Sequence, residues 1–359
     1  MLTRLFILQR PLISKHRNHI HTHIHQGQST LILRTLMTSS STVNPATLFN
    51  SPVRAVWNVQ GENVPTLWWP AKGQLATKKG PKGTSEPVNT VLFMIPGNPG
   101  LIDYYIPFLQ TVHDKCEGKI DIFGASHLGH SAGPHNTDPS RLYTLEEQVE
   151  SKIAILDRLK EMYPAGTRII LAGHSMGSWL ALRVLKARPN HGIERLFELF
   201  PTIHRIADTP NGRKMQNLFK PSVRSIVGGT VSTLRFIFSA PPVLKSIVGL
   251  FTGQEGDMAQ VTSQQLLFSS VVKNCLFLAG QEMEAIKVMD KETIKQHADK
   301  FVFYYGKTDE WSPIENYYEM QEEFPQVKSM LCEQGMVHAF VLGHGEAMGV
   351  LVGEWIHDM

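Results

Sequence analysis

The sequence has few cysteines and little net charge, and both deficits exclude classes of protein. Three cysteines, Cys116, Cys275 and Cys332, occur among 359 residues, with no C-x-x-C pair. This spacing offers neither a disulfide framework nor a zinc site, and it suits a reducing compartment. The net charge is +3 and the basic residues are dispersed, so we expect no nucleic-acid partner. With 42% hydrophobic and 19% charged residues, the chain is ample for one α/β domain with an inserted cap.

Acidic residues are missing from the first part of the chain, where the first one is Glu62. The stretch before it carries basic residues among serines, threonines and histidines, such as Arg4, Arg10, Lys15, Arg17 and Arg34. Leaders of this composition resemble organelle-targeting presequences. An unstructured extension upstream of Met37, a second translation start, explains the composition equally well. We therefore expect residues 1–48 to be either disordered or a targeting segment, and the sequence leaves that choice open.

A glycine-rich turn at residues 173–177, Gly-His-Ser-Met-Gly, matches the pattern G-x-S-x-G. An apolar β-like run at 167–172 precedes it, and a helix-like run at 178–185 follows. This setting predicts a strand–turn–helix elbow that presents Ser175 as a nucleophile, with glycines where backbone and substrate approach closely. An ordinary glycine-rich turn with a solvated serine is the alternative. We expect His174, inside the elbow, to point away from Ser175 and only to pack against neighbouring structure.

A serine hydroxyl needs a base and an orienting carboxylate, which should lie later in the chain. Asp309 follows a predicted strand at 300–305, where a doubly wound sheet displays functional groups. His338 follows another predicted strand at 328–333. The order Ser175, Asp309, His338 is that of α/β-hydrolases and differs from the orders of the chymotrypsin and subtilisin types. We therefore predict a catalytic triad made of these three residues.

Each predicted partner of the serine has a rival interpretation. Glu310 is a neighbouring carboxylate, and Asp309 has an alternative role as a cap for the turn before Pro313. His338 is one of 16 histidines, and a lone histidine after a strand is more often structural than catalytic.

An acyl-transfer site also needs two backbone N–H groups that bind the developing oxyanion. One should be the amide of Met176, directly after the nucleophile. The other should come from Pro-Gly-Asn-Pro-Gly at 96–100, which follows a predicted strand at 90–95. Pro99 has no N–H, so we assign the second role to the amide of Asn98. A plain turn explains the composition of this segment as well.

Strands and helices alternate along the remaining chain, which indicates a mostly parallel sheet flanked by helices, the α/β-hydrolase fold. A loop is expected at 77–87 between two early strands, the first near 53–59. The other elements are expected as strands at 90–95, 120–125, 167–173, 195–200, 300–305 and 328–333, and as helices at 103–115, 145–162 and 175–187. The roughly 100 residues before the strand at 300–305 are too long for a connection and predict an inserted helical cap. The core thus comprises residues 49–200 and 298–359, and the cap comprises residues 201–297.

The predicted cap contains an unusually apolar stretch, residues 218–251, with a proline pair at 241–242. Each arm is too short to cross a membrane and is interrupted by basic residues, Lys220, Arg224, Arg235 and Lys245. The arms are suited to entering one leaflet of a membrane or the monolayer of an oil droplet, with the basic residues at headgroup level. A pair of lid helices that merely covers the active-site cleft is the alternative.

Eight segments carry a family resemblance: residues 95–100, 104–105, 126–130, 173–178, 200–203, 210–213, 304–309 and 337–340. Together they resemble the lipid droplet-associated hydrolases, and the likeness extends from about residue 88 to the C-terminus. The resemblance implies the same triad of Ser175, Asp309 and His338. It also implies an enzyme that acts at lipid droplets and at the endoplasmic reticulum surface. Val337 stands where the family commonly has proline, outside the reacting groups.

The chemistry predicted from these residues is hydrolysis of a carboxylic ester through an acyl-enzyme, with no metal or organic cofactor. The apolar cap favours a neutral lipid ester, of the sterol ester or acylglycerol class. Acyl transfer to an alcohol or thiol uses the same triad and is an alternative. A droplet-surface organiser with a vestigial hydrolase site is an alternative of another class. An epoxide hydrolase or dehalogenase is disfavoured, because those enzymes need a carboxylate at the elbow. Acyl chain length and oligomeric state stay open.

Overall fold

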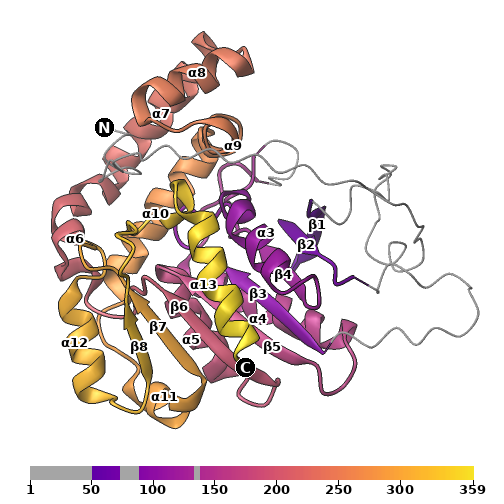
Figure 1. Ribbon diagram of the computed structural model, residues 1–359. Helices are drawn as coiled ribbons and strands as arrows, with labels where there is room; N and C mark the ends of the chain where they lie inside the picture. The colour runs from indigo at the N-terminus through magenta and orange to yellow at the C-terminus, as the bar shows by residue number, and fades with distance from the viewer. Residues whose placement is uncertain (1–50, 73–88, 133–137) are drawn as a thin grey trace, which may run out of the picture.

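The structure, a computed structural model, describes residues 51–72, 89–132 and 138–359. The extension expected at 1–48 and the loop expected at 77–87 lie outside the described residues. The described chain forms a central sheet between two layers of helices, and a further group of helices extends beyond the sheet (Figure 1).

Within the described residues, one sheet contains eight strands in the order β1-β2-β4-β3-β5-β6-β7-β8. The strands are β1 Val53–Val59, β2 Glu62–Trp69, β3 Thr90–Ile95, β4 Asp121–Ala125, β5 Arg168–His174, β6 Ile193–Leu199, β7 Phe301–Tyr305 and β8 Lys328–Leu331. The pairs β1–β2 and β2–β4 are antiparallel, and every other neighbouring pair is parallel. Strands β3 and β4 are buried along their whole length, as parallel strands covered on both faces must be. The predicted mostly parallel sheet flanked by helices is confirmed.

The second strand, β2, is absent from the sequence prediction, which places only one strand before the loop at 77–87. The pattern is broken by Pro65, and proline is depleted from strand interiors because it has no N–H to donate. In the structure Pro65 pairs with Val56 of β1, whereas the pairing of β2 with β4 begins only at Thr66. The proline therefore lies just outside the ladder between β2 and β4, where its missing N–H is tolerated.

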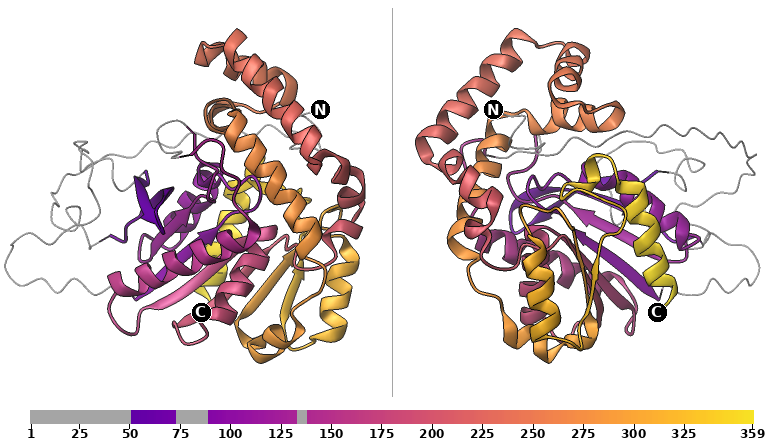
Figure 2. Two further views of the ribbon diagram at one scale, coloured as in Figure 1. Left: turned by 180° about the vertical axis from the view of Figure 1, so that it is seen from behind. Right: turned by 60° about the vertical axis from the view of Figure 1, so that its left-hand side comes forward.

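Helices cover both faces of the sheet and create two hydrophobic cores (Figures 1 and 2). One core lies under α4 Leu145–Met162, α5 Met176–Ala187 and α12 Ile314–Glu323. The other lies under α3 Ile106–Lys115 and α13 Gly345–His357, which pack against each other. Because β3, β5, β6, β7 and β8 run parallel, the loops that follow them meet at one edge of the sheet.

The segment between β6 and β7 contains six α-helices: α6 Pro210–Met215, α7 Pro221–Ile237, α8 Pro241–Thr252, α9 Gly256–Val261, α10 Ser269–Ala285 and α11 Lys291–Gln296. A proline starts α6, α7 and α8, where its missing N–H costs no helical hydrogen bond. Short 3₁₀ segments occupy Ile102–Tyr105, Ile206–Asp208, Gln216–Phe219, Ala298–Lys300 and Phe340–Leu342, and a π-helical turn occupies Thr262–Leu266.

Helix α10 supports the two apolar helices of this segment, which extend away from the sheet (Figure 1). Val272 and Leu276 of α10 form a small buried cluster with residues of α7 and α8, namely Val227, Val231, Leu244 and Val248. None of the helices in the described ranges is both long and apolar enough to span a membrane.

Two glycine-to-alanine changes should move stability in opposite directions. A Cβ on Gly177, at the start of α5, would lie 2.3 Å from the carbonyl oxygen of Ile95, a backbone atom of β3. Gly177→Ala should therefore lower the free energy of unfolding by about 1–3 kcal/mol. A Cβ on Gly229, inside α7, meets no atom within 4 Å, so Gly229→Ala should raise it by up to about 1 kcal/mol. Urea unfolding measures both, and an unchanged midpoint for Gly177→Ala would contradict the close packing of α5 on β3.

Candidate active site

Ser175 lies in the turn between β5 and α5 with a strained backbone, φ 55° and ψ −125°. A side chain in this left-handed region persists only when the surroundings hold it there. Three backbone hydrogen bonds do so: the Ser175 N–H donates to Leu199, and the N–H groups of Ser178 and Thr202 donate to the Ser175 carbonyl. A Cβ on Gly173 would lie 2.6 Å from the Cα of Ser178, so the turn closes only with glycine there. The elbow is thus fixed by its neighbours, with Ser175 half-buried at its tip.

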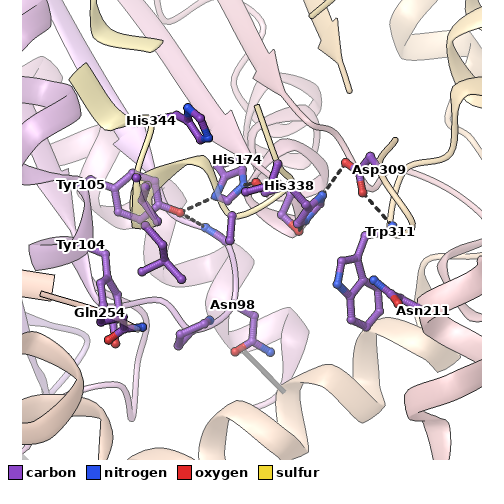
Figure 3. A pocket seen from close by; sticks show the side chains of 18 of the residues that line it. Asn98, Tyr104, Tyr105, His174, Asn211, Gln254, Asp309, Trp311, His338 and His344 are labelled. Carbon is purple, nitrogen blue, oxygen red and sulfur yellow. Dashed lines mark hydrogen bonds and ion pairs between the residues drawn. The ribbon is translucent and has the colours of Figure 1, made fainter. Parts of the chain in front are cut away.

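The imidazole of His338 joins Ser175 and Asp309 in a chain of hydrogen bonds. Its Nε2 is 2.8 Å from Ser175 Oγ. Its Nδ1 is 2.6 Å from Asp309 Oδ2 (Figure 3). A carboxylate only accepts, so Nδ1 carries the hydrogen and Nε2 is free to accept the serine proton. The structure therefore brings together the three residues that the sequence predicts as a triad, from the loops after β5, β7 and β8.

The carboxylate of Asp309 is buried and fully used. Its Oδ1 accepts from the backbone N–H groups of Trp311 at 2.7 Å and Ser312 at 3.1 Å, while Oδ2 faces His338. The capping role weighed as an alternative for Asp309 thus exists beside its contact with the imidazole. Glu310 instead pairs with Lys214 Nζ at 2.8 Å on an exposed side of the loop. The rival carboxylate therefore lines the same cavity but is hydrogen-bonded to Lys214 and not to His338.

His174 does more than pack, and the expectation of a packing role alone is wrong. Its Nε2 is 2.8 Å from the backbone carbonyl of His338, and its Nδ1 is 2.6 Å from the hydroxyl of Tyr105 (Figure 3). The hydroxyl also accepts from the N–H of Gly97 at 2.8 Å. Since a carbonyl only accepts, Nε2 of His174 carries the hydrogen, and Tyr105 donates to Nδ1. This chain ties the loop after β3 to the backbone of His338.

Burial keeps His174 neutral. Its pKa is lowered to about 3, first by burial and then by the nearby charge of His338. The two rings lie 5.4 Å apart between centroids. A neutral neighbour leaves His338 free to become positively charged without repulsion. In the sequence, the only sign that His174 supports His338 is its place inside the Gly-His-Ser-Met-Gly motif. Its hydrogen bond with Tyr105 cannot be identified from sequence spacing.

The residues predicted as oxyanion donors flank Ser175. Met176 is the first residue of α5, where the N–H groups of a helix lack intrahelical partners. The loop after β3 passes close by, because a Cβ on Gly97 would lie 3.0 Å from Ser175 Cβ. Asn98 lines the same cavity as Ser175, and no hydrogen bond within the described residues uses its backbone N–H. Both residues thus lie close to Ser175, and their role as oxyanion donors stays a prediction.

The cavity around Ser175 has a volume of about 180 Å³. Its walls combine core loops with the cap loop after α8; they include Tyr104, Gln254, Trp311, Val341, Leu342 and His344. Tyr104 donates to Thr262 Oγ1 at 2.6 Å, and Thr262 donates to Gln254 Oε1 at 2.5 Å. This pair of hydrogen bonds fastens the cap loop over the cavity. The described residues contain no group of three or more His, Cys, Asp or Glu side chains able to hold a metal ion.

Comparisons with known proteins agree on one family. The sequence-family model for Lipid-droplet associated hydrolase matches residues 88–341. The lipid droplet-associated hydrolase of Rattus norvegicus is 34% identical over 291 residues, covering 77% of this chain and 87% of the relative. The relative of the same name from Homo sapiens is 31% identical over 284 residues, covering 75% and 85%.

Solved structures show the same fold at low identity. A haloalkane dehalogenase of Bradyrhizobium elkani gives a TM-score of 0.59 at 14% identity, covering 86% of this chain and 98% of that one. An esterase of Thermogutta terrifontis gives a TM-score of 0.54 at 14% identity, covering 85% and 98%. The chain therefore has the α/β-hydrolase fold, with cap helices between β6 and β7.

Removing the hydroxyl of Tyr105 should destabilise the protein. Tyr105→Phe leaves the buried Gly97 N–H without an acceptor and His174 Nδ1 without a donor, which should cost about 1–3 kcal/mol of unfolding free energy. Urea denaturation checks this value. Tyr318→Phe is the matched control, because Tyr318 is 56% exposed. Removing its hydroxyl should change the free energy of unfolding by less than about 0.5 kcal/mol. Equal urea midpoints for the two variants would show that the Tyr105 hydroxyl does not stabilise the fold.

Proposed function

The chain belongs to the lipid droplet-associated hydrolase family, and from this premise we propose that it is a serine hydrolase of neutral lipid esters. The observation that carries the proposal is the hydrogen-bonded chain from Ser175 through His338 to Asp309 at a strand–turn–helix elbow. Sterol esters and acylglycerols are the substrate classes that fit the apolar cap beside this site.

The proposed reaction is acyl transfer to water through a serine ester. Ser175 Oγ attacks the ester carbonyl while its proton moves to Nε2 of His338. The N–H groups of Asn98 and Met176 bind the oxyanion of the tetrahedral intermediate. His338 then gives the proton to the departing alcohol oxygen, and the C–O bond of the ester breaks. Water, deprotonated by the same imidazole, attacks the acyl-enzyme, releases the acid and regenerates Ser175.

The surroundings of His338 suit this proton traffic. Asp309 is held by two backbone amides and so keeps the imidazole oriented with Nδ1 protonated. His174 stays uncharged and holds the His338 backbone from the other side. The imidazole therefore gains a positive charge next to a carboxylate and away from any second imidazolium, which lowers the cost of that charge.

The size of the cavity bears on how a lipid would bind. An enclosed space of about 150 Å³ accommodates a molecule such as benzene, and the cavity here measures about 180 Å³. The proposed binding mode places the ester and the first carbons of the acyl chain inside. The rest of the lipid extends toward the cap, past the loop that carries Gln254.

The cap presents an exposed apolar surface that suits a lipid monolayer. Five side chains of α7 and α8 are between 61% and 85% exposed: Ile226, Phe236, Ile237, Leu250 and Phe251. Lys220, Arg224 and Lys245 are charged side chains of the same segment, able to reach lipid headgroups. We propose that this surface, named here the apolar cap surface, binds the droplet monolayer or the surface of the endoplasmic reticulum membrane.

The same surface supports the second candidate, an organiser of the droplet surface with little hydrolase activity. The observation that favours it is the grouping of five exposed apolar side chains on two neighbouring helices, since scattered single apolar side chains would need no explanation. Separating catalysis from surface binding, as in the next two experiments, distinguishes the candidates. Transfer of the acyl group to an alcohol instead of water would appear as a transester product when an acceptor is added.

Replacing the nucleophile should abolish hydrolysis. Ser175→Ala should lower kcat on p-nitrophenyl butyrate, and on cholesteryl and glyceryl esters, by about 10³-fold or more. It should also abolish labelling by a fluorophosphonate probe. Ser225→Ala, on an exposed turn of α7, is the matched control and should behave as the unaltered protein. Persistent labelling of Ser175→Ala would remove Ser175 from the nucleophile's role.

Polar changes on the apolar cap surface should prevent lipid binding without touching the chemistry. The triple variant Phe236→Ser, Leu250→Ser, Phe251→Ser should lose co-flotation with triolein droplets, because about 1.5–3 kcal/mol of burial is lost per side chain. Its kcat on p-nitrophenyl butyrate in solution should stay within about twofold. Val288→Ser alters an apolar side chain that is 80% exposed between α10 and α11, and it should float normally. Retained flotation of the triple variant would show that another surface binds the droplet.

A further inference from the structure

We infer that Glu282 is a positioning residue for ester hydrolysis, because it holds the side chain of Asn98 and thereby the loop that carries one oxyanion donor. The inference rests on the proposed function. Glu282 lies on the cap helix α10, outside the walls of the catalytic cavity, so its influence on the reaction has to pass through Asn98.

The side-chain amide of Asn98 is saturated by α10. Its Nδ2 is 2.9 Å from Glu282 Oε1 and 2.9 Å from the backbone carbonyl of Cys275. An amide nitrogen has two hydrogens, and both are used. Cys275 and Glu282 are two helical turns apart on the same face of α10. The Asn98 side chain therefore binds two residues of α10 that lie two helical turns apart.

The loop after β3 explains why this contact matters. Pro96 and Pro99 have no N–H, the Gly97 N–H donates to Tyr105, and the Gly100 N–H donates to His130 Nδ1 at 2.7 Å. Only the Asn98 N–H is left over, and within the described part of the chain it makes no hydrogen bond. An N–H that has to receive an oxyanion cannot also anchor its own residue. Asn98 is anchored through its side chain instead.

The environment of Glu282 is costly for a carboxyl group. The side chain is buried, with 4% of the residue exposed, and within the described ranges it forms no ion pair with lysine or arginine. Burial raises the pKa of Glu282 to about 7, and the hydrogen bond from Asn98 opposes this rise. A buried carboxyl whose hydrogen-bond partner belongs to the oxyanion loop is better explained by positioning than by packing.

Steady-state kinetics of the full chain on p-nitrophenyl butyrate test the inference. Glu282→Ala should lower kcat by about 10- to 100-fold with KM within about twofold, because a misplaced oxyanion donor weakens transition-state binding more than ground-state binding. Glu282→Gln keeps an oxygen that accepts from Asn98 Nδ2, and it should restore most of that kcat. Glu284→Gln changes an exposed carboxylate two residues along α10 and is the control.

A double-mutant cycle separates positioning from general damage. Asn98→Ala keeps the backbone N–H but removes the tether, so it should match Glu282→Ala, and the double variant should be no worse than either alone. Additive losses, a defect in KM alone, or no rescue by Glu282→Gln would overturn the inference. Thermal unfolding shows which variants are folded, and Asn98→Ala carries the test if Glu282→Ala does not fold. Normal activity of Glu282→Ala together with an inactive Ser175→Ala would overturn the role of Glu282 and leave the proposed function intact. An active Ser175→Ala would overturn the proposed function itself.

Discussion

The two hydrogen bonds of the His338 imidazole are the constraint on which the rest of the site depends. They require three loops, after β5, β7 and β8, to meet within tenths of an ångström. The parallel sheet makes this possible by bringing the carboxyl ends of these strands to one edge. The strained backbone of Ser175 holds one end of this hydrogen-bonded series, and the two backbone N–H groups that bind Asp309 hold the other end. His174 fixes the middle by holding the His338 backbone.

Much of this architecture follows from local sequence patterns. Buried strands of the parallel sheet are short runs of apolar residues, and the glycine-rich elbow has a distinctive composition. Both can therefore be recognised in the sequence without knowledge of their tertiary contacts. The strand β2 is not, because Pro65 disguises it and its partners lie far along the chain. The same holds for the polar contacts that support the site. Tyr105 and His174 are 69 positions apart, and Asn98 and Glu282 are 184 apart. Their pairing depends on tertiary packing, which no periodicity records.

The cap has two apolar regions of different kinds. One is internal, where α10 packs on α7 and α8 through a small cluster separate from the two cores of the sheet. The other is the apolar cap surface, whose side chains are exposed on α7 and α8, helices that extend away from the sheet (Figure 1). A cap with its own cluster keeps its shape when its outer side chains meet a hydrophobic phase. The cap is attached to the sheet by α10, whose side chains enter both cores and whose residues Cys275 and Glu282 bind the loop after β3.

The position of α10 has a consequence for how the family diversifies. Residues 98 and 282 belong to different parts of the molecule, yet a hydrogen bond joins their side chains. If Glu282 positions Asn98 as we infer, a change at one position imposes a requirement on the other, and we expect the two positions to co-vary among related sequences. A chimaera that exchanged the cap of one relative for that of another would inherit a working lid only if the matching residue after β3 travelled with it.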